Sequence, residues 1–472
     1  MTSSLLSILC AVGLVAASAT VAHCESPTPA PTAAVQTSPL AGTWSATLEA
    51  GGQKLRIQLN VKSDGGRLSG TLDSLDQGAF GLPLDTLVQD DGKVRFAKPA
   101  VGVAFEGTLQ GNHIDGVFSQ GAAKIPLVFT RGGPVAALRP QYPKGALPYR
   151  SEDVRISSPG AVLAGTFTHP AGSGPVPAIL LVSGSGRLDR DETMFEQKPF
   201  LVLSDYLTRA GYAVLRLDKR GVGASTGDRA QETLDNLSSD ALAAVAWLKV
   251  RPDVAPHRVG VLGHSEGGAV AALAAAAGAG DIDFVVMLGG PGEPIVDLLT
   301  EQTVGLVRAQ GAPESVLAAE QDIARQEFEI LKQEPDLGRA RTRLQALAAA
   351  WRPKQPELAD LLTGGMDRVL SPEVHSLLSY APGETLRRIS CPILAIYGGK
   401  DLQAPADSNA RAAIEALTTG AAPTFTLVKL PGLNHLFQTA KTGSLAEYAQ
   451  SEETMSPIAL RTVSAWLDSV AR

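Results

Sequence analysis

Short apolar segments rich in β-branched residues alternate with helical patterns over most of the carboxyl-terminal part of this chain. The apolar segments are residues 178–182, 212–217, 259–262, 284–288, 393–397 and 425–430. One helical pattern between them places Leu234, Leu237, Leu242, Val245 and Leu248 on a single face. Continuous apolar strands that alternate with amphipathic helices are typical of a parallel sheet covered on both sides. The sequence therefore predicts an α/β domain over residues 151–472.

One interval in this pattern is much longer than a single crossover helix needs. About a hundred residues, mostly with helical patterns, lie between Leu288 and Ile393. Open α/β sheets bind ligands at the carboxyl ends of their strands, and an insertion here would project over that edge. We expect residues 294–380 to form a helical lid. The alternative is a group of helices packed beside the sheet without contact with a ligand.

A strand, a sharp turn and an alanine-rich helix follow one another around Ser265. The serine lies between Gly263 and Gly267 in the pattern Gly-x-Ser-x-Gly. A nucleophile on a strand-to-helix turn needs small residues two positions before and after it, because the turn passes close to neighbouring backbone. The helix N-terminus favours the negative charge that develops during acyl transfer. The pattern also occurs in ordinary turns, but its place between strand and helix predicts that Ser265 is a nucleophile.

A serine hydroxyl needs a base, and in α/β-hydrolases the order along the chain is serine, acid, histidine. Among the seven histidines, His435 lies in a loop after the final predicted strand. His264 adjoins the serine, and we expect its side chain to point away across the turn. The acid belongs in the loop after the preceding strand, where Asp401 follows a pair of glycines. Asp401 completes the expected order, and Asp407 is the nearest substitute.

Two backbone N–H groups should stabilise the oxyanion of the tetrahedral intermediate. One belongs to Glu266, the residue after the nucleophile. The other comes from the loop that begins at Ser183, where Ser185 is the first expectation and Gly184 the second.

Two charged runs near these loops could bind a substrate. Asp218, Lys219 and Arg220 follow one predicted strand, and residues 189–191 (Asp-Arg-Asp) follow another. Charged residues at such strand ends usually form buried networks that hold the surrounding loops. We therefore predict a structural role for both runs.

Residues 41–132 have a different pattern. Short runs in which apolar and polar residues alternate are separated by residue pairs typical of tight turns, such as Gly-Gly, Asp-Gly and Gly-Asn. This pattern is typical of consecutive antiparallel hairpins. About eight runs fit a small barrel or sandwich. Residues 23–40, rich in Pro, Ala and Thr, and residues 133–150, rich in Pro and Gly, are interpreted as linkers.

Residues 1–22 have the pattern of a signal peptide, because a short apolar run gives way to small residues. The run is shorter than a membrane span requires. We expect export to the periplasm or the cell exterior, although no Lys or Arg precedes the run. Cys24 fits a lipid-anchored cysteine poorly, because His23 precedes it.

Charge and cysteine content exclude several classes of function. The formal net charge of −7 provides no positive surface for nucleic acid or an anionic membrane. A small neutral or apolar substrate fits better than a polyanion. The three cysteines indicate neither a disulfide framework nor a metal site, and Cys391 is interpreted as a small buried hydrophobe.

Five segments occur together in one known group of enzymes. They are Ser183-Gly184-Ser185-Gly186 with Asp189-Arg190-Asp191-Glu192, residues 215–225, residues 263–268, Gly399-Lys400-Asp401 and Leu433-Asn434-His435. In this combination the chain resembles bacterial esterases of the EstD-like group, α/β-hydrolases related to serine aminopeptidases and dienelactone hydrolases. The resemblance covers about residues 150–472. Many α/β-hydrolases have His-Gly where this chain has Ser183-Gly184.

The resemblance implies an α/β-hydrolase fold and a separate amino-terminal all-β domain, to which the patterns above add a mostly parallel sheet flanked by helices and a helical lid. It implies a serine carboxylesterase that acts on short acyl esters through an acyl-enzyme, without cofactor or metal. The expected partner is a small ester, with no nucleic acid and no membrane span, and the sequence leaves a homo-oligomer open. The alternative is an exported serine peptidase, in which Glu266 would bind the substrate ammonium. A binding protein with a relic triad is a third interpretation.

Overall fold

The computed structural model describes residues 38–50, 53–75, 79–120, 123–133, 138–172, 174–278 and 280–471. The predicted signal peptide, Cys24 and nearly all of the first predicted linker lie outside these residues. The chain divides into two compact units, Met1–Ala137 and Leu138–Arg472, which are described separately.

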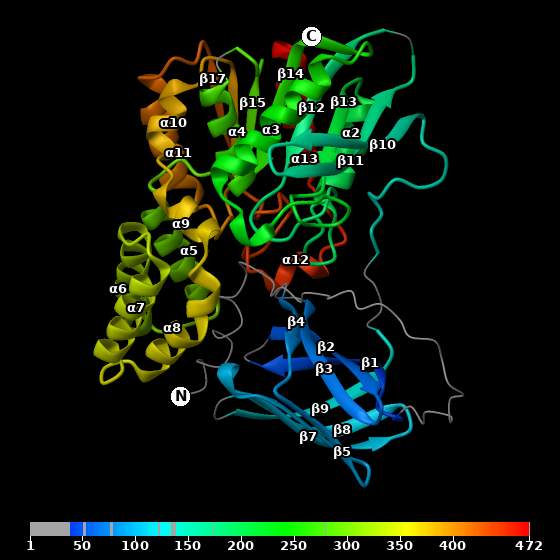
Figure 1. Ribbon diagram of the computed structural model, residues 1–472, viewed down its shortest axis with the longest axis vertical. Helices are drawn as coiled ribbons and strands as arrows, with labels where there is room; N and C mark the ends of the chain where they lie inside the picture. The colour runs from blue at the N-terminus through cyan, green and yellow to red at the C-terminus, as the bar shows by residue number, and fades with distance from the viewer. Residues whose placement is uncertain are drawn as a thin grey trace. The chain divides into compact units, whose positions relative to one another are not determined.

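The first unit contains one antiparallel sheet, in the strand order β4-β3-β2-β1-β9-β8-β7-β6-β5 (Figure 1). The strands are β1 (Gly42–Ala50), β2 (Gln53–Asp64), β3 (Arg67–Ser74), β4 (Ala79–Pro83), β5 (Thr86–Asp90), β6 (Lys93–Lys98), β7 (Val103–Gln110), β8 (His113–Gln120) and β9 (Ala123–Arg131). Consecutive strands are neighbours, as expected for successive hairpins, and β1 pairs with β9.

The sheet of the first unit curves strongly, so that strands near its two ends approach each other. A Cβ atom added to Gly70 on β3 would lie 2.9 Å from Leu87 Cδ2 on β5. The Leu84 N–H, between β4 and β5, also donates to Gly70 O at 3.0 Å. The buried rings of Phe96, Phe105 and Phe129 pack together inside, with the first two centroids 5.1 Å apart. This curvature is that of a barrel, one of the two predicted arrangements.

The second unit contains a mixed sheet in the order β10-β11-β13-β12-β14-β15-β16-β17. Its strands are β10 (Tyr149–Ser158), β11 (Ala161–Pro170), β12 (Val176–Val182), β13 (Ala213–Leu217), β14 (Val254–His264), β15 (Val285–Leu288), β16 (Ile393–Gly398) and β17 (Phe425–Leu430). The pairings from β13 to β17 are parallel, whereas β10 pairs with β11 and β11 with β13 in antiparallel register.

The sequence pattern does not predict the antiparallel strands β10 and β11. β10 is an edge strand with mostly exposed residues, so it lacks the continuous apolar run of a buried strand. The predicted linker over 133–150 also extends too far. Arg139 donates from Nη1 to Ser451 O at 2.6 Å, and Gln141 donates from Nε2 to Met455 O at 2.7 Å. The chain is therefore already part of the second unit before Tyr149.

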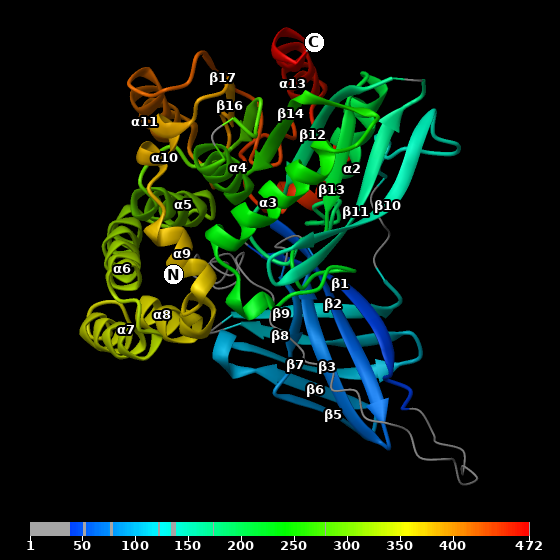
Figure 2. The same ribbon diagram turned by 45° about the horizontal axis from the view of Figure 1, so that its top comes forward.

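Helices cover both faces of the second sheet (Figures 1 and 2). The buried apolar residues of α2 (Pro199–Arg209) and α13 (Pro457–Val470) pack on one face. Those of α3 (Leu234–Lys249), α4 (Glu266–Ala277) and α11 (Ala406–Thr418) pack on the other. Two short elements, η3 (Arg229–Gln231) and α12 (Ala446–Gln450), lie in connecting loops.

Six helices fill the long interval between β15 and β16. They are α5 (Ile295–Ala309), α6 (Glu314–Gln333), α7 (Leu337–Trp351), α8 (Pro356–Val369), α9 (Pro372–Ser379) and α10 (Pro382–Arg388). In Figure 1, α6, α7 and α8 stand together to one side of the sheet. The Leu234 N–H of α3 donates to Ser376 Oγ of α9 at 3.0 Å, which attaches α9 to the body of the domain. None of the helices within the described residues has the length and apolar composition needed to cross a bilayer.

Candidate active site

Ser265 occupies a strained turn between the end of β14 and the start of α4. Its φ of 55° and ψ of −122° lie outside the regions that L-residues normally adopt. A Cβ atom at Gly263 would lie 1.9 Å from Gly267 O, and one at Gly267 would lie 2.1 Å from Val182 O. Both positions therefore require glycine, because any side chain would collide with backbone.

Asp401 and His435 form a buried pair. His435 Nδ1 lies 2.8 Å from Asp401 Oδ2, and both side chains are almost fully buried. Asp401 Oδ1 accepts hydrogen bonds from the N–H groups of Gln403 and Ala404, each at 2.8 Å. The carboxylate is thus held in a fixed orientation, and a proton on Nδ1 leaves Nε2 free to act as a base.

The residues of the candidate site follow the carboxyl ends of four neighbouring strands. Ser265 follows β14, Gly289 follows β15, Asp401 follows β16 and His435 follows β17. A Cβ atom at Gly289 would lie 3.3 Å from both Asp401 Oδ2 and His435 Nδ1. The Ser265 N–H donates to Leu288 O at 2.9 Å, so the ends of β14 and β15 are joined beside the pair.

The loop after β12 passes next to the serine. A Cβ atom at Gly184 would lie 3.2 Å from Ser265 Cβ. However, the Gly184 N–H donates to Glu192 Oε1 at 2.8 Å, so in this structure it is not free to bind an oxyanion as expected. Ser185 remains the candidate for the second oxyanion N–H. Its side-chain Oγ donates to Glu266 Oε2 at 3.2 Å. Glu266 is the first residue of α4, where backbone N–H groups have no acceptor within the helix.

Residues 159–413, more than half of the chain, match the X-Pro dipeptidyl-peptidase (S15) family. The chain belongs to this family. The matched region includes Ser265 and Asp401 and ends before His435.

The resemblance of this S15-family chain to EstD-like esterases is also confirmed. The chain is 29% identical over 257 residues to esterase EstD of Thermotoga maritima. This match covers 54% of this chain and 53% of that protein. The chain spans about half the length of the curated relatives it matches.

Among solved structures, a Pyrococcus furiosus esterase has a TM-score of 0.43 at 17% identity, covering 71% of this chain and 99% of the other. A dienelactone hydrolase of Anabaena variabilis has a TM-score of 0.38 at 19% identity, covering 69% and 100%.

His264 of this S15-family chain lies buried between two loops. Its Nδ1 lies 2.9 Å from Glu192 Oε1, and its Nε2 lies 2.9 Å from the backbone oxygen of His435. Burial opposes the charged ring, but Glu192 and the two hydrogen bonds outweigh it and hold the pKa of His264 above its ordinary value. Both ring nitrogens are occupied, so His264 is not available as the base.

A buried cluster of charges surrounds Glu266. Lys219 Nζ lies 3.0 Å from Glu266 Oε1 and 3.5 Å from Glu232 Oε1. Arg229 forms ion pairs with Glu232 and, at 3.0 Å, with Glu373 Oε2 on α9. Burial lowers the pKa of Lys219, but the carboxylates outweigh it and the pKa is raised.

Among the described residues, the acidic group close enough to share a metal ion consists of Glu232, Glu266 and Glu373, whose oxygens lie within 4.8 Å of one another. Lys219 and Arg229 already supply two positive charges to these oxygens. We therefore interpret the group as an ion-pair cluster. Sequence reasoning missed Glu232 and Glu373, because neither lies within a recognisable motif.

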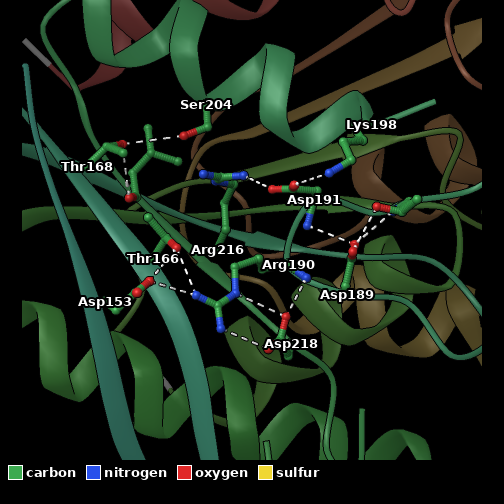
Figure 3. Close-up of polar contacts among 12 residues, drawn as sticks. Asp153, Thr166, Thr168, Asp189, Arg190, Asp191, Lys198, Ser204, Arg216 and Asp218 are labelled. Carbon is green, nitrogen blue, oxygen red and sulfur yellow. Dashed lines mark hydrogen bonds and ion pairs between the residues drawn. The ribbon is translucent and has the colours of Figure 1, made fainter. Parts of the chain in front are cut away.

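The predicted structural role of both charged runs is confirmed, and Figure 3 shows part of their network. Arg190 donates to both oxygens of Asp218, at 3.1 and 2.9 Å. Asp191 pairs with Lys198 at 3.1 Å and with Arg216. These bonds hold the loop after β12 against the end of β13.

Arg220 completes this network through an ion pair with Asp240 on α3, at 2.7 Å. Lys219 instead extends toward Glu266, as described above. Asp189 instead accepts hydrogen bonds from the Thr193 N–H and hydroxyl, at 2.9 and 2.8 Å, so every charged group of both runs has a partner within the protein.

Proposed function

We propose that this chain is a serine carboxylesterase that cleaves short acyl esters. The observation that carries the proposal is the buried Asp401–His435 pair, at 2.8 Å, at the strand ends next to the strained Ser265 turn. In the proposed reaction, His435 Nε2 takes the proton of Ser265 Oγ as this oxygen attacks the ester carbonyl carbon. The N–H groups of Glu266 and Ser185 stabilise the oxyanion.

Collapse of this intermediate breaks the ester bond, and His435 gives its proton to the departing alcohol. The acyl group is then bonded to Ser265 Oγ. Water, deprotonated by His435, attacks the acyl carbon and releases the carboxylic acid, which restores the Ser265 hydroxyl. Asp401 keeps the imidazole of His435 oriented and stabilises its charged form.

An aminopeptidase-like serine peptidase is the second candidate, and the description of the S15 family favours it. Such an enzyme needs a carboxylate to bind the ammonium of the substrate. Glu266 is poorly suited, because it is 4% exposed and its two oxygens already bind Lys219 and Ser185. This observation supports the esterase over the peptidase.

The deciding experiment compares hydrolysis of p-nitrophenyl esters from acetate to decanoate with hydrolysis of aminoacyl and X-Pro p-nitroanilides. We expect turnover of the short esters and little turnover of the anilides. Ser265→Ala protein is the control for hydrolysis by contaminants. Turnover of the anilides above that of the esters would favour the peptidase.

We also propose that the protein is exported, because residues 1–22 have the pattern of a signal peptide. Expression of the full chain in a Gram-negative host, followed by cell fractionation and mass measurement, tests this. Cleavage after Ala19 or Ala22 is expected, and an intact amino terminus in the cytoplasm would contradict it.

A further inference from the structure

Glu192 and His264 connect the oxyanion loop with the loop that carries the base. Glu192 Oε1 accepts the Gly184 N–H at 2.8 Å and lies 2.9 Å from His264 Nδ1. On the other side of the ring, His264 Nε2 lies 2.9 Å from His435 O. The exposed fractions of Glu192 and His264 are 0% and 3%, so water does not compete for these bonds.

The two contacts of His264 determine where its protons lie. An ionised carboxylate and a backbone carbonyl oxygen can only accept hydrogen bonds, so with Glu192 ionised both ring nitrogens of His264 donate. Only the doubly protonated imidazolium does this. A neutral ring would place a bare nitrogen against one of the two oxygens at 2.9 Å.

The surroundings of the ring are compatible with this charge. Glu192 supplies the opposite charge, and Asp401 also favours the charged form. The His435 ring lies at a centroid distance of 4.8 Å, and the Phe437 ring, which carries no charge, lies at 6.3 Å. The left-handed backbone of Glu192, with φ of 54°, is uncommon for a residue other than glycine, as expected where the structure imposes a specific conformation.

We propose that Glu192 and the His264 imidazolium act as a pair of positioning residues that set the oxyanion loop and the base loop relative to each other. The inference rests on the proposed serine hydrolase function. Glu192 holds Gly184, the residue before Ser185, and His264 holds the backbone of His435. Loss of the pair would misplace the Ser185 N–H and the His435 ring without removing either.

The test compares Glu192→Gln and His264→Gln with Glu293→Gln in the full-length protein. Glu293 is the control for removing a buried acidic side chain, because it accepts hydrogen bonds from Ser408 and Asn409 outside the site; burial raises its pKa to about 7, so the assays are run above about pH 8, where it is mostly ionised. For p-nitrophenyl acetate, we expect kcat to fall about tenfold to a hundredfold in the first two variants, less than for a lost oxyanion donor. KM should change by less than about threefold, because the pair does not contact substrate.

A second readout does not depend on substrate. In ¹⁵N-histidine spectra of Ser265→Ala protein, His264 should keep the imidazolium signature well above pH 6.5, its ordinary pKa. Adding Glu192→Gln should lower this pKa, because burial then acts without the opposing charge. The activity of Glu192→Gln enzyme should correspondingly decline as the pH rises through the new pKa.

A neutral His264 near pH 7, or a folded Glu192→Gln enzyme with the kcat of Glu293→Gln enzyme, would overturn the inference. Absence of ester turnover in the wild type would instead reject the proposed function. The spectra would still decide the protonation of His264 in that case.

Discussion

Ser265 and its neighbouring glycines explain why the turn at the site admits so few residue types. The serine has a φ of 55°, and Gly263 and Gly267 allow the turn to lie against the backbone of β12 and α4. Strain of this kind persists only when the surrounding structure enforces it, and it concentrates at functional sites. Substitutions at Ser265 and at Gly263 therefore test different properties, the first activity and the second stability.

The first test concerns the proposed triad. Ser265→Ala and His435→Ala should each lower kcat/KM for p-nitrophenyl acetate by about 10⁴-fold or more, because the three groups act as a unit. Asp401→Asn should also lose most activity, since an amide would not hold the required imidazole tautomer. Thermal unfolding should confirm that the variants are folded. Near-normal turnover by folded Ser265→Ala protein would rule out the assignment.

The second test concerns the turn itself. Gly263→Ala should lower the free energy of unfolding by at least about 3 kcal/mol, because the new Cβ would lie 1.9 Å from Gly267 O. Gly305→Ala in α5 is the control, since its nearest contact, Leu402 O, would lie at 3.6 Å. The control should be neutral or stabilising by about 0.5–1 kcal/mol. Equal denaturation midpoints for the two variants would show that the close approach at Gly263 is relieved at little cost.

At the scale of elements, α9 is a helix of the long insertion that ion pairs connect to the site. Glu373 on α9 pairs with Arg229, and the ion pairs continue through Glu232 and Lys219 to Glu266. This chain of charges connects the insertion to the residue after the nucleophile. We propose on this basis that helices α5 to α9 form a lid that influences which acyl groups reach Ser265.

Replacement of residues 295–379 by a short linker should change the ratio of rates on butyrate and decanoate esters. The rate of inactivation by a small serine-reactive phosphonate should change less, because a small group does not need the lid. Since the deletion also removes part of the core, Glu373→Gln with Ser376→Ala provides a milder variant that loosens α9. An unchanged ratio of butyrate to decanoate rates in both variants would contradict the proposal that these helices act as a lid.

At the scale of the whole molecule, the first unit has its own core and no recognisable catalytic cluster among its described residues. Phe96, Phe105 and Phe129 pack within its barrel, and His113 is its single described histidine. The second unit contains Ser265, Asp401 and His435 together. We propose that the first unit mediates self-association or docks beside the site, with no direct part in catalysis.

Residues 138–472 expressed alone should therefore fold and hydrolyse activated esters. A second truncation that starts at 148 removes the bonds of Arg139 and Gln141 to residues 449–455 and should be less stable by about 1–3 kcal/mol. Turnover, denaturation and mass in solution are the measurements. A folded 138–472 fragment without any turnover would mean that the first unit contributes to the site, whereas turnover in a smaller assembly would support self-association.

Much of this molecule follows from local sequence. The apolar strands, the hairpins of the first unit and the Gly-x-Ser-x-Gly turn each depend on residues close together in the chain, whose periodicity and size are visible in the sequence. The order of Ser265, Asp401 and His435 along the chain follows from the strands that precede them. The polar edge strand β10 was missed, because it is stabilised by pairing with β11 and lacks a hydrophobic run.

Tertiary structure alone decided which polar groups meet. The sequence offered the Gly184 N–H as an oxyanion donor, but in the folded protein this N–H donates to Glu192. Glu192 and His264 lie 72 residues apart, and Arg229 and Glu373 lie 144 apart. Such contacts depend on how strands and loops are arranged in space, and a single carboxylate or imidazole has no periodicity that would reveal its partner. The sequence by itself determined most of the elements and the order of the candidate triad residues, whereas the packing of distant loops decided which groups surround them.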